Sequence, residues 1–399
     1  MKRLIPMLSL VALTTFGGAP DKDKIDVLCI YYPEWHVYPE WEAYYGKGTT
    51  EWMCVSNTVA RFPGHHQPVV PLMGFYDESD PKVAAQEIDL AADAGIDVFL
   101  YDWYWANGKP IQHEGLERGF MKAANRGRLK FALMWAYHDR DVPFQSKFGE
   151  EKKHWLWKLA RTEEDFLAAF AYCAQTYFGD PGYYRKDGKL FFSMYSSERF
   201  VKDMGGPAKT RETLAKAQAL VRERGLPPVH FNAMVFNAGN AAPAIEAGFD
   251  STSVYSINGF HSKKGSAMER SRQFVMAYDD LVESADAVNC GLAAVSPMHI
   301  PVVQRGWDCT ARCDPAEPFP WRKSHYPYMG VFANATPEKF AGAVRTALRR
   351  AAEDPKKPGA ILVNAWNEYT EGSWLMPDTR NGRAYLDALR RALGRGGAK

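Results

Sequence analysis

Eight short apolar runs alternate with amphipathic segments along almost the whole chain, and this alternation constrains the fold more than any other feature. Parallel strands that are buried on both faces have short, continuous apolar sequences of this kind. The runs predict strands over 25–32, 96–103, 129–136, 189–195, 229–236, 251–257, 300–307 and 360–366. Apolar residues at helical spacing predict helices over 81–94, 163–176, 210–223, 267–284, 337–353 and 382–393.

A series of strand–helix units with no break in composition predicts a single (β/α)8 TIM barrel over residues 20–399. The sixth strand, over 251–257, is the least typical because it is polar and rich in serine. An open doubly wound sheet is the alternative, but no Gly-x-Gly-x-x-Gly motif follows the first strand. The connections 33–80, 137–162 and 308–336 are unusually long, and in a barrel they are loops of the functional face.

The first 19 residues have the pattern of an export signal. A basic start (Lys2 and Arg3) precedes an apolar run over 4–16 and small residues at 17–19. The run is shorter than the roughly 20 residues that a membrane-spanning helix needs. We therefore expect a secreted or periplasmic protein that is not held to a membrane after cleavage of the signal. The alternative is that the run forms an apolar first strand of a cytosolic protein.

Charge and cysteine content exclude other classes of protein. The net charge is +2, from 49 Lys and Arg against 47 Asp and Glu, so no broad basic field is available to bind nucleic acid. Cys29 and Cys173 lie in apolar runs and are predicted to be core thiols. Cys309 and Cys313 are predicted to form a local disulfide or to stay as two free thiols. Their spacing fits no usual zinc site.

Aromatic and polar residues occur together at the ends of the predicted strands. A barrel builds its chemistry from these positions. Aromatic rings stack on the C–H faces of sugars, and a few placed polar groups bind the hydroxyls in an apolar cleft. The alternative is that half of the rings are barrel packing. We predict a carbohydrate cleft formed by Tyr32, His36, Tyr101, Asp102, Trp103, Trp105, Trp135, His138, Tyr255, Arg305, Trp307 and Asn367.

Glu368 and Glu371 follow the eighth predicted strand and are the candidate catalytic residues. Glycosidic cleavage needs one carboxylic acid that protonates the leaving oxygen and a second carboxylate that acts as base or nucleophile. Mutual repulsion raises the pKa of one member of such a pair, so that one stays protonated while the other is ionised. The alternative is an exposed pair on a solvated loop.

Other candidate chemistries have weaker patterns. Asp102 is either a second acid or a structural hydrogen-bond partner, and His138 is either part of an acid/base pair with Asp139 or a ligand of a sugar hydroxyl. A metal could be held by three histidines of the first long loop and its start (His36, His65, His66), but neither an HExxH motif nor an acidic calcium loop is present. No Gly-x-Ser-x-Gly elbow of a serine hydrolase occurs.

Segment 364–378 reads Asn-Ala-Trp-Asn-Glu-Tyr-Thr-Glu-Gly-Ser-Trp-Leu-Met-Pro-Asp. It resembles the Asn-Glu-Trp-x-Glu-Gly…Glu-Pro signature of glycoside hydrolase family 99, and is closer still to the family-99-like (WbsX-like) proteins. Segments 31–36, 74–77, 95–105 and 382–386 resemble the same group. The resemblance implies a (β/α)8 barrel and retaining, endo-acting hydrolysis of α-mannosides, with an oligosaccharide or polysaccharide as substrate and without a metal or other cofactor.

The resemblance also implies roles for the two glutamates. Glu368 would be the base toward the sugar 2-hydroxyl, so that a 1,2-anhydro sugar forms. Glu371 would be the general acid and then the base for the incoming water. The chain departs from the family pattern at Tyr369 and Thr370, where the family has Trp-His, and at Asp378, which follows a proline where the family has Glu before it.

Two other functions are compatible with the same residues. Family-99-like proteins have also been described as glycosyltransferases of polysaccharide synthesis, although nucleotide-sugar donors are cytosolic and an export signal argues against this. The other alternative is a carbohydrate-binding barrel without activity.

Overall fold

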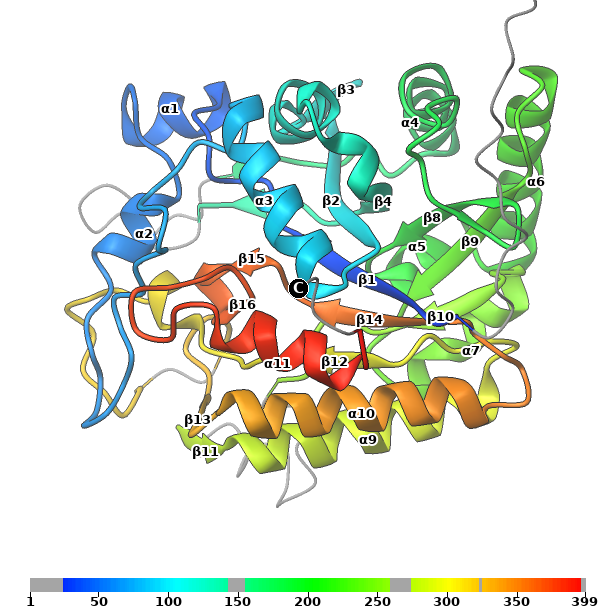
Figure 1. The fold of residues 1–399 in the computed structure, drawn as a ribbon. Coiled ribbons are helices and arrows are strands. Elements are labelled where there is room, and N and C mark those ends of the chain that lie inside the picture. The colour runs from blue at the N-terminus through cyan, green and yellow to red at the C-terminus, as the bar shows by residue number, and fades with distance from the viewer. Residues whose placement is uncertain (1–23, 143–154, 259–273, 323–324, 396–399) are drawn as a thin grey trace, which may run out of the picture.

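The computed structural model describes residues 24–142, 155–258, 274–322 and 325–395, and its parallel strands form a barrel surrounded by helices (Figure 1). The order in the sheet is β10-β9-β8-β4-β2-β1-β14-β12. Backbone hydrogen bonds of Thr252 with Met298 and Ile300 bring the two outer strands together, so the predicted (β/α)8 barrel is confirmed. The eight barrel strands are β1 (Asp26–Tyr31), β2 (Val98–Ala106), β4 (Lys130–Trp135), β8 (Lys189–Met194), β9 (Val229–Met234), β10 (Ser251–Ser253), β12 (Val302–Gln304) and β14 (Ala360–Asn364). The expected export signal over 1–19 lies outside the described residues.

Burial on both faces explains the sequences of the barrel strands. All nine residues of β2 are buried, and β1 pairs in parallel with β2 on one side and with β14 on the other. The polar strand β10 is also buried, because its hydroxyls find partners inside the barrel. Ser253 donates to Asn232, and Ser251 contacts both Asn232 and His230.

The outer helices begin where the sequence supplies capping residues. Asp80, Thr162 and Thr336 each accept a backbone N–H of the first turn, at the starts of α3, α4 and α10. These caps explain why the predicted bounds of α3, α4 and α10 are confirmed. The helices are α1 (Pro39–Tyr45), α2 (Trp52–Ser56), α3 (Pro81–Ala94), α4 (Glu163–Thr176), α5 (Ser197–Asp203), α6 (Pro207–Glu223), α7 (Ala238–Ala247), α9 (Tyr278–Val295), α10 (Pro337–Glu353) and α11 (Ala384–Ala392).

The predicted helix over 267–284 is wrong. The structure has a short strand, β11 (Val275–Ala277), followed by α9, which begins at Tyr278 and ends at Val295. Residues 267–273 lie outside the described part of the chain. Asp279 and Asp280 lie in the first turn of α9, where the helix dipole favours negative charge, and its buried side recurs at Leu281 and Leu292.

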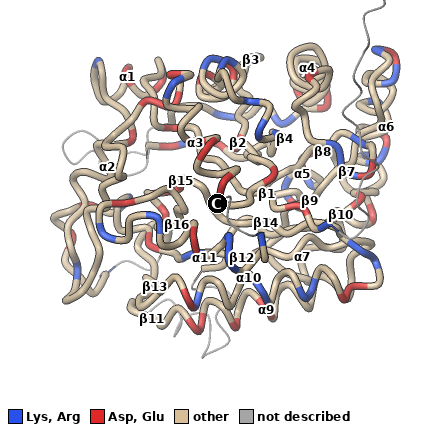
Figure 2. Tube along the Cα trace, in the orientation of Figure 1, with Lys and Arg blue, Asp and Glu red and all other residues tan. Residues whose placement is uncertain are grey.

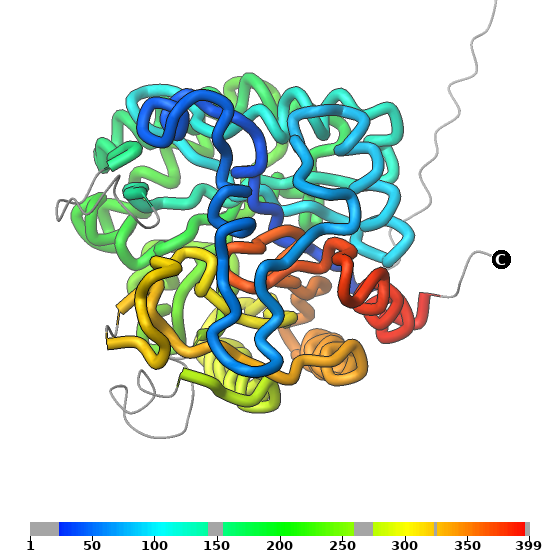
Figure 3. Tube along the Cα trace, turned by 90° about the vertical axis from the view of Figure 1, so that its left-hand side faces the viewer, coloured from blue at the N-terminus to red at the C-terminus, as the bar shows by residue number. Residues whose placement is uncertain are grey.

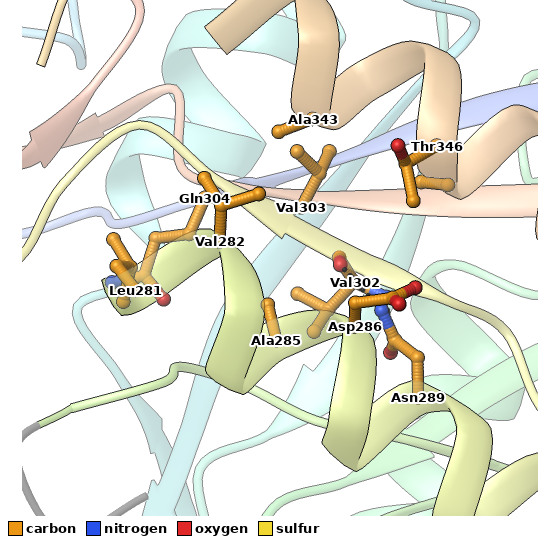
Figure 4. Close-up of a pocket in the computed structure, with 11 residues that line it drawn as sticks. Leu281, Val282, Ala285, Asp286, Asn289, Val302, Val303, Gln304, Ala343 and Thr346 are labelled. Carbon is orange, nitrogen blue, oxygen red and sulfur yellow. Dashed lines mark hydrogen bonds between the residues drawn. The ribbon is translucent and has the colours of Figure 1, made fainter. Parts of the chain in front are cut away.

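Helices α9 and α10 cover the short strand β12, as Figure 4 shows. The space between them is about 20 Å³, which has room for about one water molecule. The side chain of Asn289 donates to the carbonyl oxygen of Val302 and accepts from its backbone N–H, at 2.9 and 3.0 Å. A helix side chain therefore supplies the hydrogen bonds that a longer strand partner would supply.

The long loops lie together on one side of the barrel, at the left of Figure 1, and Figure 3 looks onto this face. The loops that follow the barrel strands carry short elements: β3 (Lys109–Ile111), β5 (Arg140–Asp141), β6 (Trp155–Trp157), β13 (Val331–Ala333), β15 (Asn367–Glu368) and β16 (Ser373–Trp374). The short strand β7 (Arg185–Lys186) precedes β8 and pairs antiparallel with its first residues. The loop after β1 crosses the face beside the loop after β12, and Arg61 donates to backbone oxygens of Asp314, Pro315 and Glu317 across this contact. This is the side at which a barrel carries its functional site.

The six cysteines all lie in the described residues and carry free thiols. Cys29 and Cys173 are buried in the core, as predicted. The thiol of Cys313 lies 3.5 Å from the backbone oxygen of Cys309, so the second of the two predictions for this pair, free thiols, is the one that the structure contains.

Charges of both signs are distributed over the outer helices, as Figure 2 shows for α6, α9 and α10. This arrangement agrees with the small net charge and shows no large basic face over the drawn elements. Within the described ranges, every helix is too short or too polar to cross a lipid bilayer.

Candidate active site

A cavity of about 580 Å³ opens at the carboxyl ends of the barrel strands. Each of the eight strands contributes a wall residue from its end or from the loop that follows it. These are Tyr32, Asp102, His138, Tyr195, Phe236, Tyr255, Trp307 and Glu368 in strand order along the chain, with Tyr104, Arg140, Asn237, Asn258, Arg312, Tyr326 and Glu371 among the others. Carboxylate, amide, guanidinium and aromatic groups therefore surround one space, as carbohydrate recognition requires.

The two candidate catalytic glutamates lie at the two ends of a tight turn after β14. Strand β15 pairs antiparallel with β16, and the 3-10 turn Tyr369–Glu371 connects them. Gly372 ends the turn with φ 71°, and a Cβ atom there would lie 2.4 Å from the Cβ atom of Asp308, so the position requires glycine. Glu368 and Glu371 both line the cavity and are 1% and 8% exposed.

One arginine joins the two glutamates. Arg312 ends the 3-10 helix Cys309–Arg312, and its Nη1 donates to Oε1 of Glu371 at 3.1 Å while its Nη2 lies 3.5 Å from Oε1 of Glu368. Its Nε donates to the hydroxyl of Thr370 at 3.0 Å, and that hydroxyl donates to Glu368 at 2.7 Å. Tyr326 adds a hydrogen bond of 2.8 Å to Glu371. A single guanidinium thus fixes both carboxylates on one side of the cavity.

A second arginine extends this network into the floor of the cavity. Nη2 of Arg140 donates to Glu34 at 2.6 Å and to Glu51 at 3.1 Å, and Arg312 lies 3.3 Å from Glu51. The hydroxyl of Tyr32 lies between them, donating to Glu51 at 2.7 Å and accepting from both arginines at 2.8 and 2.9 Å. Buried charges of both signs are therefore paired and hydrogen-bonded, as their burial demands.

The two buried glutamates of the cavity floor, Glu34 and Glu51, have different protonation states. Burial raises the pKa of Glu34 to about 8, although Arg140 opposes this shift. Burial also disfavours the ionised form of Glu51, but the guanidinium groups of Arg312 and Arg140 outweigh it and lower the pKa of Glu51 to about 2. At neutral pH, Glu34 therefore keeps its proton while Glu51 carries the negative charge that balances the arginines.

Burial also sets the protonation of the groups that face the cavity. It raises the pKa of Glu368 well above the usual range for a carboxyl group, with Arg312 opposing and the negative charge of Glu371 adding to the shift. It raises the pKa of Asp102, against the hydrogen bond that Tyr255 donates at 3.0 Å. It lowers the pKa of His138 to about 4, so this ring is neutral.

Seven of the sequence-predicted residues lie together in this cavity. Tyr32, Asp102, His138, Tyr255 and Trp307 line it with the two glutamates. Oδ1 of Asp102 and Nε1 of Trp307 are buried and have no hydrogen-bond partner among the described residues. Nδ1 of His138 donates to the backbone oxygen of Asp139 at 2.9 Å, which leaves Nε2 of the neutral ring as an acceptor.

Four predicted aromatic ligands lie outside the cavity lining, which corrects the prediction for them. Successive side chains of a strand point to opposite faces, so Asp102 and Tyr104 of β2 face the cavity while their neighbours face the helices. The outward rings pack in pairs, at 4.4 Å for Tyr101 with Tyr31, 5.8 Å for Trp103 with Trp105, and 5.9 Å for Trp135 with Phe166. The barrel-packing alternative therefore describes Tyr101, Trp103, Trp105 and Trp135.

Two predicted polar ligands are also engaged elsewhere. His36 is buried between Glu78 at 2.7 Å and Glu114 at 3.0 Å. Although burial disfavours its charged form, these carboxylates raise the pKa of His36 to about 10. The amide of Asn367 accepts from the backbone N–H of Tyr32 and donates to its carbonyl oxygen. Both residues hold loops in place and do not line the cavity.

Arg305 lies in a different cavity, where it contacts Asp378 and the ring of Trp374. This position corrects the prediction that Arg305 lines the same cleft as the two glutamates.

Sequence reasoning missed several of the residues that organise the site. Tyr104 could have been found by applying the two-residue strand period to Asp102. Arg140 follows His138 by two residues, and both line the cavity. Arg312 and Tyr326 lie in the long loop after β12, and no local pattern distinguishes them from surface residues.

The (β/α)8 barrel of this chain is also found in solved glycoside hydrolases. It is similar to a glycoside hydrolase-like protein, with a TM-score of 0.59 and 15% identity, over 98% of this chain and 97% of that one. It is also similar to the GH99 endo-alpha-mannosidase from Bacteroides thetaiotaomicron, with a TM-score of 0.58 and 17% identity, over 94% and 99% of the two chains. The sequence model of the family described as glycosyltransferase WbsX matches residues 27–389, and the chain belongs to this family.

Curated relatives of the chain are two proteins of Xanthomonas campestris pv. campestris, both described as uncharacterized protein WxcX. The protein of strain B100 is 28% identical over 381 residues, and that of strain ATCC 33913 is 28% identical over 380 residues. The alignments cover 94% of this chain and 50% of each relative. The chain thus spans about half the length of the relatives that it matches.

Proposed function

We propose that the protein is a retaining glycoside hydrolase that cleaves glycosidic bonds in a polysaccharide or other glycan. The observation that carries this proposal is that Glu368 and Glu371 line one cavity and share the guanidinium of Arg312. Glycosidic cleavage needs two carboxyl groups beside one bond, and their protonation must differ. The similarity to a GH99 endo-alpha-mannosidase supports the fold that this chemistry would use.

In the first step, ionised Glu368 takes the proton of the sugar 2-hydroxyl, and the 2-oxygen attacks the anomeric carbon. Glu371 gives its proton to the leaving oxygen, so the glycosidic bond breaks as the 1,2-anhydro ring closes. The raised pKa of Glu368 makes its ionised form a stronger base than an ordinary carboxylate. The same shift favours the proton on Glu368 in the substrate-free protein, so the reaction proceeds from the fraction of the protein in which the proton lies on Glu371. In the second step, Glu371 takes a proton from water, which opens the anhydro ring with net retention, and Glu368 returns its proton to the 2-oxygen.

The other cavity groups would bind and orient the sugar. Neutral His138 offers an acceptor to a hydroxyl, Asp102 and Tyr255 form a hydrogen-bonded pair, and Trp307 supplies an aromatic surface. Tyr326 and Arg312 both contact Oε1 of Glu371, and would hold this carboxylate in position when it is ionised between the two steps.

We propose α-mannosides as the first substrates to test. The identity of the sugar is not assigned from family 99, because this chain differs from the family pattern at Tyr369 and Thr370. Tyr369 is fully buried and stacks 5.8 Å from Trp374, and Thr370 is fully buried between Arg312 and Glu368. Neither lines the cavity. Positions that would contact substrate in the family are thus used here to hold the catalytic turn.

The experiment is to incubate wild type, Glu368→Gln and Glu371→Gln with α-mannans and with plant, algal and bacterial polysaccharides, and to follow reducing ends and the released anomer. We expect cleavage with retention by wild type and a loss on the order of a thousandfold or more in each variant, because each lacks one of the two proton-transfer groups. Release of the inverted anomer would exclude the anhydro route. Unchanged cleavage by either variant would exclude that residue from the reaction.

A glycosyltransferase is the second candidate, because the family is described as glycosyltransferase WbsX. It predicts that a nucleotide sugar binds in the cavity and that a nucleoside diphosphate is released when an acceptor glycan is added. If titration with nucleotide sugars shows binding and no panel glycan is cleaved, the hydrolase proposal is wrong. If nothing in the panel is cleaved but Glu371→Gln binds a glycan as tightly as wild type, the carbohydrate-binding alternative is favoured.

We also propose that the protein is exported, on the basis of the basic, apolar and small residues of segment 1–19. Expression of the full chain in a bacterial host, followed by N-terminal sequencing of the periplasmic and extracellular protein, tests this proposal. We expect a mature start near residue 20. Recovery of the intact N-terminus in the cytosol alone would contradict it.

A further inference from the structure

A second cavity, of about 240 Å³, lies beside the active-site cavity on the same face of the barrel. It is formed by the loops after β1, β12 and β14. The backbone of residues 306–308 and Gly372 separates it from the two glutamates, and Asp308 N–H donates to the backbone oxygen of Glu371 at 2.7 Å within this wall. Trp307 lines both cavities. The function proposed above leaves this second space unused.

Arg305 is the central charged group of the second cavity. Its guanidinium carbon lies 3.8 Å from the ring centroid of Trp374 and 4.0 Å from that of Tyr385. Two aromatic rings thus contact the guanidinium, and its side chain is 7% exposed. The two rings cover part of the guanidinium, and a further ligand would bind through its N–H groups.

The hydrogen-bonding capacity of the Arg305 guanidinium is incompletely used. Nη2 of Arg305 reaches Asp378 at 3.4 Å, which is long for a charge-assisted bond, and Nε has no partner in the part of the chain that the structure describes. Asp378 is itself engaged by shorter bonds, from Trp374 at 3.0 Å and from Asn381 N–H at 2.7 Å. Its negative charge is shared among several donors. Arg305 also has a side-chain hydrogen bond with Tyr385, and the N–H groups that Asp378 and Tyr385 do not use are the donors for a second acceptor.

The charges of the other titratable groups in the cavity make the region around Arg305 positive. Asp308 is occupied by His65 and Gln67, each at 2.8 Å. Burial lowers the pKa of His66, so this ring is neutral at neutral pH. Arg380 lines the cavity and is exposed. The carboxylates are thus engaged within the protein, whereas Arg380 adds a second positive charge near Arg305.

We propose that the second cavity is a binding site for a sugar that carries a carboxylate, such as a hexuronate residue of an acidic glycan. A planar carboxylate matches the in-plane fork of a guanidinium. Trp307 and the ring of Phe62 supply apolar surface for the sugar ring, and Nε1 of Trp307 is a buried donor without a partner among the described residues. The sugar part of the ligand depends on the glycan function proposed above, whereas the carboxylate part does not.

The test is titration of the purified protein with D-glucuronate and D-galacturonate, with D-glucose, D-galactose and acetate as comparison ligands, by calorimetry or ligand-observed NMR. We expect the uronates to bind about tenfold or more tightly than the neutral sugars and than acetate. Arg305→Lys, which keeps the charge but loses the fork, should weaken uronate binding about tenfold, and Arg380→Ala should weaken it by a smaller factor. Arg383→Ala, at an exposed arginine outside the cavity lining, is the matched control and should not change it.

Glu371→Gln separates this proposal from the proposed hydrolase. It alters the active-site cavity, and we expect the affinity for uronates to stay unchanged whether or not cleavage is lost. Equal binding of uronates and neutral sugars would overturn the proposal. If acetate binds as tightly as the uronates, the cavity is a general anion site, and the proposal that it recognises a sugar ring is overturned. If Arg305→Lys fails to fold, unchanged uronate binding by Arg380→Ala would overturn the proposal on its own.

Discussion

At the scale of single residues, Arg312 connects the two glutamates, and its charge controls the proton affinity of one of them. Its positive charge lowers the pKa of Glu368, against the effect of burial. Removing that charge in Arg312→Gln should raise the pKa of Glu368 further. Because ionised Glu368 is the proposed base, the acid limb of kcat/KM against pH should move to higher pH, with a loss at neutral pH on the order of a hundredfold.

The matched control is Arg312→Lys, which keeps a positive charge. Its pH profile should move less than that of Arg312→Gln, although its activity also falls because lysine cannot contact Glu371 and Thr370 with one planar group. If the acid limb of kcat/KM has the same apparent pKa in both variants as in wild type, Arg312 does not control the protonation of Glu368.

A second prediction at this scale concerns the two glutamates of the floor. Glu51 is ionised and balances Arg140 and Arg312, so Glu51→Gln should reduce the free energy of unfolding by about 3–5 kcal/mol at pH 7. Glu34 is protonated in the folded protein at pH 7, so Glu34→Gln removes no charge and should not reduce the free energy of unfolding at this pH. Urea titration of both variants measures the difference, and equal losses would contradict the assignment of the proton.

The pH dependence of Glu34→Gln has a definite sign. The pKa of Glu34 is about 8 in the folded protein, above its value in the unfolded chain. Its contribution to stability is therefore present below about pH 4.5 and is lost as the pH rises through 8. Glu34→Gln should gain stability relative to wild type between pH 5 and 8. A difference that does not change with pH would contradict the raised pKa.

The residues that line the active-site cavity were predicted from the sequence only in part. Asp102 and His138 were found because polar residues at strand ends are rare and informative. Trp103, Trp105 and Trp135 were misplaced because aromatic rings are equally suited to a sugar cleft and to the layer between barrel and helices. The strand period would have separated them from Asp102. Arg312 was missed because its position depends on contacts across the barrel mouth, far apart in the sequence.

At the scale of elements, the turn from β15 to β16 positions the two glutamates that are proposed to be catalytic, and Gly372 permits this turn. Gly372→Ala places a methyl group 2.4 Å from Asp308 and forces an L-residue into the left-handed region. We expect a loss of about 3 kcal/mol in unfolding free energy, together with a loss of activity, because the turn must shift.

Gly382→Ala is the matched control for Gly372→Ala. Gly382 has φ 53°, also left-handed, but its Cβ atom would meet open space. It should cost only the conformational strain, about 1 kcal/mol, and leave activity intact. Chemical denaturation and activity assays measure both variants. Equal effects of the two substitutions would show that the contact with Asp308 does not hold the turn.

Elements were predicted well where local signals agree. Helices α3, α4 and α10 combine a capping side chain with a clear apolar period, and their bounds follow from the sequence. Helix α9 was predicted eleven residues too early, at 267 against 278, because the segment before it also has apolar residues at helical spacing. The short strand β10 was recognised from its position among the strand–helix units, although its serines are typical of a loop.

At the scale of the whole molecule, a buried histidine lies where the barrel closes. His299 contacts Thr252 and Asn289, each at 3.0 Å, where β10 meets the chain before β12. Burial lowers the pKa of His299 to about 3, so it is neutral in the folded protein and protonates in the unfolded chain below about pH 6.5. Its contribution to stability is present above pH 6.5 and is lost as the pH falls toward 3.

This linkage predicts how the stability of the molecule responds to acid. The difference in unfolding free energy between wild type and His299→Asn should narrow by roughly 2 kcal/mol between pH 6.5 and pH 5. Urea titrations at several pH values measure it, and the exposed His325→Asn is the control that should show no such narrowing. A constant difference for His299→Asn would contradict a neutral histidine at the closure.

The barrel as a whole could be predicted because its strands and helices recur in order along the chain. The presence of two cavities could not, because the wall between them is made from backbone of residues 306–308 and of Gly372, which no sequence pattern brings together. Arg305 was predicted to line the cleft of the two glutamates, but it lines the second cavity.

Glu368 and Glu371 are proposed to act on one bond with different roles, and changing the leaving group tests this difference. With the sugar found in the glycan panel, kcat/KM is measured on a glycoside with an alkyl leaving group and on one with a nitrophenyl leaving group, which needs no protonation to depart. We predict that Glu371→Gln recovers most of its lost activity on the nitrophenyl glycoside and that Glu368→Gln does not. Equal losses on both substrates in both variants would contradict the division of roles.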